Sequence, residues 1–83
     1  MAIVIDVSKI PFLKAEKVAD VISDEVDNLP NYWVKSFYTF TSSDFHPIEI
    51  TEASAKNCSI IVVVGKNDVS VLQVCPMTPE KKS

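Results

Sequence analysis

The stretch SIIVVVGKNDVSVLQVC, residues 59–75, decides the fold. Residues 60–64 are apolar without a break and residues 69–75 nearly so, as in strands that are covered on both faces. Residues 65–68 between them are short and polar, which predicts a tight hairpin. We therefore expect two adjacent antiparallel strands in the middle of a sheet.

The hairpin also places the two cysteines. A two-residue loop of Lys66 and Asn67 sets a register in which Cys58 lies opposite Cys75, whereas a three-residue loop would shift them apart. Opposed Cβ atoms lie about 4.5–5.5 Å apart, slightly too far for a relaxed disulfide near 3.8 Å. The pair is therefore either a strained bridge or two reduced, half-buried thiols. We expect the reduced state, because the chain reads as cytosolic.

Working outward, three more elements are predicted. Residues 2–7 are apolar and β-branched, as in a strand. Residues 12–27 carry apolar side chains at spacings of three to five, which predicts a helix with Pro11 in its first turn. Residues 32–41 are aromatic and β-branched, again as in a strand, and residues 48–51 are read as a short edge strand.

The order β-α-β-(β)-β-β predicts an α+β fold, with one amphipathic helix on a mostly antiparallel four- or five-stranded sheet. It is loosely ferredoxin-like. Eighty-three residues with 47% hydrophobic content fit one domain, residues 1–76, followed by a flexible tail, residues 77–83.

One helix covers only one face of such a sheet, yet both faces of the hairpin are apolar. An uncovered face would exceed the apolar patch of a typical monomer, about 300–600 Å². We therefore expect self-association, most simply as a homodimer, or docking on another protein through the face that carries Ile61, Val63 and Leu72. The alternative is a second layer made by residues 42–57 and the tail.

The predicted helix carries an acidic stripe, because four carboxylates recur at spacings of four, four and three: Glu16, Asp20, Asp24 and Asp27. The stripe is either a solvated outer face or a surface that meets a basic protein partner. Trp33 is the second candidate contact, since tryptophan is typical of interface hot spots as well as of cores.

Candidate chemistry is sparse. Ser42, Ser43, Asp44 and His46 combine catalytic residue types, but adjacency in sequence is not a catalytic relay, and a polar turn is the better interpretation. Asp44, His46 and Glu49 lack the recurrent spacing of a metal site. One glycine followed by a strand is not a phosphate loop. We expect no catalytic residue, metal or cofactor.

Charge excludes further classes. The chain has eight basic residues, all of them Lys, against 11 acidic ones, for a net charge of −3. Nucleic-acid binders usually carry a basic stripe rich in Arg, and binding to a membrane surface needs the same charge. No apolar run reaches the roughly 20 residues of a membrane span, and the start lacks the pattern of a signal peptide. The sequence thus predicts a cytoplasmic protein.

No family is identified. The first strand and helix are similar to those of small tautomerases, which need Pro after the initiator Met, and Ala2 stands there instead. We therefore predict a small, non-catalytic protein-binding or regulatory module that self-associates, with a composition that also fits a virus- or phage-encoded inhibitor of a host protein. The alternatives are a ligand-binding or enzymatic domain with its site at a dimer interface, and a structural subunit of a larger assembly.

Overall fold

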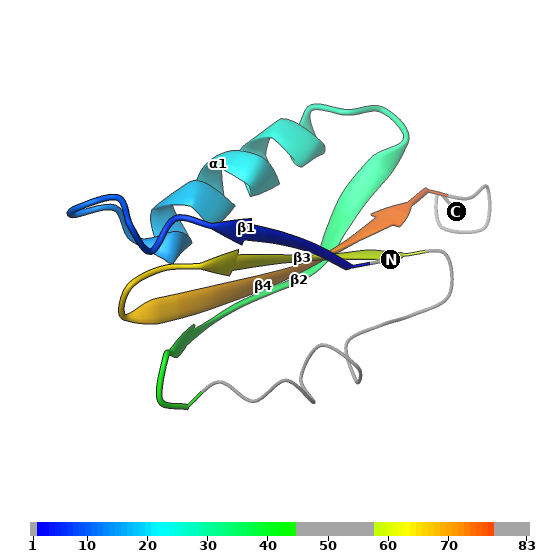
Figure 1. The fold of residues 1–83 in the computed structure, drawn as a ribbon. Helices are drawn as coiled ribbons and strands as arrows, with labels where there is room; N and C mark the ends of the chain where they lie inside the picture. Colours follow the sequence, from blue (N-terminus) through cyan, green and yellow to red (C-terminus); the bar gives the residue numbers. More distant parts are fainter. Residues whose placement is uncertain (1, 45–57, 78–83) are drawn as a thin grey trace.

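The computed structural model describes residues 2–44 and 58–77, which form one helix packed on a four-stranded mixed sheet (Figure 1). In chain order the elements are β1 (Ala2–Asp6), α1 (Ala15–Asp27), β2 (Tyr32–Thr41), β3 (Ser59–Val64) and β4 (Asp68–Pro76). The strands lie in the order β1-β3-β4-β2. β1 runs parallel to β3, and β4 is antiparallel to both of its neighbours.

This architecture confirms the α+β class and leaves the finer prediction unconfirmed. The strand order does not establish a ferredoxin-like fold, and the proposed strand at residues 48–51 lies outside the described residues. β1 and β2 occupy opposite edges, so the connection through α1 crosses the whole sheet. No helix within the described ranges is long and apolar enough to cross a membrane.

The central hairpin has the predicted register. Val64 pairs with Val69 and Ile60 with Gln73, as a loop of Lys66 and Asn67 requires. The N–H of Gly65 donates to the carbonyl of Asp68 at 2.8 Å and closes the turn. Of the two loop lengths considered, the two-residue loop is therefore the one that forms, and it sets which residues face each other.

The helix-side core is built on small side chains. Ala15 and Ala19 have no exposed surface, and their size lets α1 approach Val63 and Leu72, which are also fully buried. Ile61 packs against the same cluster. The prediction that Ile61, Val63 and Leu72 form an open docking face is therefore wrong, because α1 covers the face that carries them.

The opposite face of the sheet, which we call the distal face, is also closed at its centre. Ile60, Val62, Val69 and Val71 form a second apolar cluster, and each is only 1–5% exposed. These side chains are buried within a single chain, so the expected broad exposed apolar face is absent here. Exposed apolar groups on the sheet lie instead toward its edges, such as Val4 on β1 and Tyr38 on β2.

A bulge in β2 changes which side chains share a face. The register shifts between Val34 and Ser36, so that Lys35 is the extra residue. Trp33 pairs with Cys75 and Ser36 with Gln73, which places Trp33 and Ser36 together on the distal face. A regular strand would have put these two residues on opposite faces.

Candidate functional site

The start of α1 is held by a residue from the far end of the chain. Lys14 occupies the N-cap position without a side-chain hydrogen bond. Instead, the N–H of Ala15 donates to Oδ1 of Asp68 at 3.0 Å, and the N–H of Glu16 donates to Oδ2 at 3.2 Å. A carboxylate is favourable there because it satisfies free amides and opposes the helix dipole. The helix therefore begins at Ala15, three residues later than predicted.

Gly65 makes room for this cap. A Cβ at this position would overlap Oδ1 of Asp68 and lie 3.0 Å from the backbone nitrogen of Ala15. The turn between β3 and β4 and the first turn of α1 thus pack directly against each other. We call this region, with the loop of residues 7–14, the turn end of the sheet.

Hydrogen bonds fix the first residues of the loop of residues 7–14. Oδ1 of Asp6 accepts hydrogen bonds from the hydroxyl of Ser8 at 2.6 Å and from its N–H at 2.9 Å. These bonds hold the pKa of the Asp6 carboxyl below its ordinary value. The N–H of Ile10 then donates to the carbonyl of Val7 at 3.1 Å. Backbone and side-chain bonds therefore fix the direction in which the loop leaves β1.

Phe12 is the unusual residue of this loop. Its φ is +64°, in the left-handed region that costs a non-glycine residue about 1–2 kcal/mol. Its side chain is fully exposed, at 105%, whereas that of the next residue, Leu13, packs against the helix-side core. Ile10, two residues earlier, is 50% exposed. The loop thus presents an aromatic and an aliphatic side chain to solvent at the turn end.

A groove of about 1030 Å³ adjoins these side chains. Its walls come from the loop, from the last residues of β2 and from the β3–β4 turn. Three lysines line it, Lys9, Lys14 and Lys66, together with Glu16 and Asp68. Because the carboxylate of Asp68 caps α1, the charge left to meet a ligand is mainly positive.

The acidic stripe lies where the sequence predicted it, since Glu16, Asp20, Asp24 and Asp27 are all exposed on α1. The helix carries five carboxylates and one lysine, a net charge of −4 against −3 for the whole chain. The outer surface of α1 is therefore strongly acidic, and its first stripe residue, Glu16, also lines the groove that carries the lysines. Its role in partner binding stays a prediction.

The other sequence candidates are scattered. Trp33 is half-buried on the distal face, far along the sheet from the groove. Asp44 closes a turn in which its carboxylate accepts from the hydroxyl of Thr41 at 2.8 Å, as the polar-turn interpretation predicts. His46 and Glu49 lie outside the described residues. Within residues 2–44 and 58–77, no three His, Cys, Asp or Glu side chains gather as a metal site would require.

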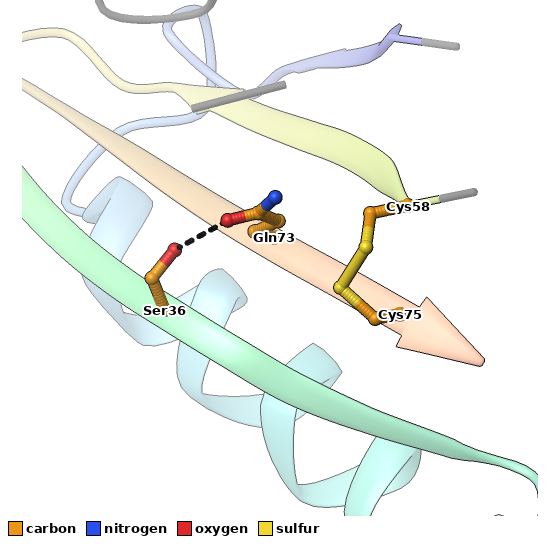
Figure 2. Close-up of a disulfide and its surroundings, with 4 residues drawn as sticks. All are labelled: Ser36, Cys58, Gln73 and Cys75. Atoms are coloured by element: carbon orange, nitrogen blue, oxygen red, sulfur yellow. Dashed lines mark hydrogen bonds between the residues drawn. A yellow bond between two sulfur atoms is a disulfide. The ribbon is translucent and has the colours of Figure 1, made fainter. Parts of the chain in front are cut away.

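The opposite end of the hairpin carries a covalent link (Figure 2). Cys58 and Cys75 form a disulfide with their Cα atoms 4.3 Å apart, so the expectation of two reduced thiols is wrong in this structure. Beside it on the distal face, Gln73 is 5% exposed and its Oε1 accepts from the hydroxyl of Ser36 at 3.4 Å. We call this region the disulfide end of the sheet.

Sequence reasoning missed Phe12 and Asp68, the two residues that shape the turn end. Phe12 looked like the first apolar residue of the helix, and Asp68 like part of a polar turn. The only local signal was the lack of a capping side chain at Lys14. Comparisons of the chain with known protein families, with curated proteins and with solved structures found no match.

Proposed function

We propose that this chain is a small, non-catalytic protein-binding module that docks on its partner through the loop of residues 7–14. The observation that carries the proposal is Phe12, an aromatic side chain that is fully exposed on a backbone in the left-handed region. Strained, exposed positions of this kind persist where function selects them, because folding alone favours their removal. Aromatic side chains are also frequent binding hot spots.

The surroundings of Phe12 define the chemistry of the partner. Ile10 and Phe12 would enter an apolar pocket, while Lys9, Lys14 and Lys66 around the groove would meet carboxylates beside it. Charges at the rim of an interface mainly set association rate and orientation. The acidic surface of α1 supports a second contact, in which a basic patch of the same partner is steered toward the helix.

The proposal also includes the cellular compartment in which the protein acts. Cytosolic reductants keep most thiols reduced, so the Cys58–Cys75 bridge weighs against the cytoplasm predicted from the sequence. We therefore propose an oxidising compartment. Alkylation of free thiols in source cells, followed by mass measurement, tests this point. If both cysteines were alkylated, they would be reduced in the cell, and the cytoplasmic prediction would stand instead.

The docking role is tested by photocrosslinking. Benzoylphenylalanine in place of Phe12 retains an aromatic side chain at the exposed position and reacts with whatever lies against it. In cells of the source organism we expect one discrete adduct with a different protein. The same photoreactive residue at Tyr38, which is 62% exposed on the distal face of β2, is the matched control and should not yield that adduct. Equal labelling from both positions, or an adduct only with a second copy of the chain, would refute the proposed role.

A further inference from the structure

Within the part of the chain that the structure describes, the outer edge of β1 is unpaired and mostly apolar. β1 is the first strand of the sheet order, and no strand among the described residues pairs with its outer side (Figure 1). Its register with β3 is regular, its sequence AIVID contains no lysine or proline, and its side chains of Ile3 and Val4 are 43% and 63% exposed. A regular, apolar, unpaired edge is a template for another strand.

The other edge of the sheet is protected. β2 carries a bulge at Lys35, and this lysine is exposed. Bulges and edge lysines both disfavour pairing with a further strand. The absence of such devices on β1 is therefore specific to that edge rather than a property of the whole sheet.

One hydrogen bond shows which backbone groups of β1 point toward β3 and which point outward. The N–H of Val7 donates to the carbonyl of Val64 at 2.8 Å, so the backbone of Val7 faces β3. Backbone groups of successive strand residues point to alternate sides, which turns Ile3 and Ile5 toward β3 as well. The N–H and C=O groups of Ala2, Val4 and Asp6 consequently point outward, away from the sheet.

We infer that a second copy of this chain pairs with β1, antiparallel and centred on Val4. In this register Val4 meets Val4 of the other copy, and Ala2 meets Asp6. Each of these pairs joins outward-facing backbone groups on both strands, which is the condition for a hydrogen-bonded antiparallel pair. The arrangement is symmetric about a two-fold axis. It also keeps the two Asp6 carboxylates apart, whereas in-register parallel pairing would place them opposite each other.

The exposed side chains fit the same register. Val4 would lie beside Val4 on the distal face, and Ile3 beside Ile5 on the helix side, so part of the exposed apolar surface of β1 would be covered in the dimer. α1 packs mainly on β4, β2 and β3, so among the described residues the helix does not cover the outer side of β1. The two sheets would join into one, with a docking loop from each copy.

Sedimentation equilibrium over a concentration series tests this dimer. We expect wild-type protein to reach twice the monomer mass of 9.2 kDa. Val4→Lys places two like charges opposite each other and should raise the dissociation constant by at least about tenfold. Val21→Lys is the matched control, because Val21 is 61% exposed but lies on α1, and it should leave the dimer unchanged.

Amide hydrogen exchange checks the register. In the dimer, the amides of Val4 and Asp6 should exchange slowly, and dilution or Val4→Pro should release Asp6 while Ile5, bonded to β3, stays protected. Protection of Ile5 also shows that each variant is folded. A wild-type chain that is monomeric throughout, a dimer that tolerates Val4→Lys, or fast exchange at Asp6 in the dimer would each overturn the inference. None of these results depends on the docking role of Phe12.

Discussion

The two ends of the sheet are held together in different ways. At the disulfide end, Cys58 and Cys75 join β3 to β4 covalently, and the N–H of Met77 donates to the carbonyl of Asn31 at 2.8 Å. At the turn end, the described residues form no disulfide, and the carboxylate of Asp68 ties the hairpin turn to α1 through hydrogen bonds.

This difference indicates that one end of the sheet stabilises the fold and that the other end displays the proposed binding side chains. The disulfide end constrains the chain even when it is unfolded, whereas the turn end uses folded-state hydrogen bonds to display strained and exposed side chains at Phe12 and Ile10. A small domain has little stability to spare, because it buries a modest fraction of its surface. We infer that the bridge at one end offsets the cost of the exposed loop at the other.

Breaking the bridge should have the largest effect. A disulfide that closes a loop with a sequence separation of 17 residues contributes about 3 kcal/mol to the free energy of unfolding. Urea unfolding of the wild-type protein with and without reductant measures this directly, because no side chain is changed. Hydrogen exchange in the reduced protein should rise first near Ser59, with Ala15 still protected.

The double variant Cys58→Ala/Cys75→Ala is the control for this comparison. Its stability should resemble that of the reduced wild-type protein and should not respond to reductant. If reductant changed the wild-type stability by less than about 1 kcal/mol, the disulfide would not be the main fastening of the sheet.

Removing the cap should have a smaller effect, confined to the turn end. Asp68→Ala leaves the first amides of α1 without an acceptor and should lower the free energy of unfolding by about 1–2 kcal/mol. Exchange at Ala15 and Glu16 should accelerate more than exchange near the disulfide. Asn67→Ala, an exposed neighbour in the same turn, is the matched control. Equal losses from the two variants would show that Asp68 acts only as a turn residue.

The part of the fold that local patterns dictate could be read from the sequence. The hairpin followed from two apolar runs around a short polar turn, its register from the choice of a two-residue loop, and the outward acidic stripe from helical spacing. The sequence also placed Cys58 opposite Cys75. It could not give their redox state, because the argument for reduced thiols rested on an assumed compartment.

The parts that were missed depend on distant residues. The start of α1 is set by Asp68, which is 53 positions from Ala15, so residues near the helix show only that no local side chain caps it. The bulge at Lys35 puts Trp33 and Ser36 on the same face, and nothing in an aromatic, β-branched strand marks such a bulge. The unbroken apolar run predicted that both faces of β3 are covered, but it could not show that Ile60 and Val62 are buried without a partner.

The central claim is that Phe12 is kept for binding at the expense of folding. The most direct test is thermal unfolding of Phe12→Asn alongside the crosslinked partner's affinity for the same variant. Asparagine tolerates a positive φ, and the lost side chain is fully exposed, so we expect stability to rise by about 0.5–1 kcal/mol, or roughly 2–8 °C, while the partner binds at least about tenfold more weakly. A variant that is less stable than the wild type, or that binds the partner equally well, would contradict the account.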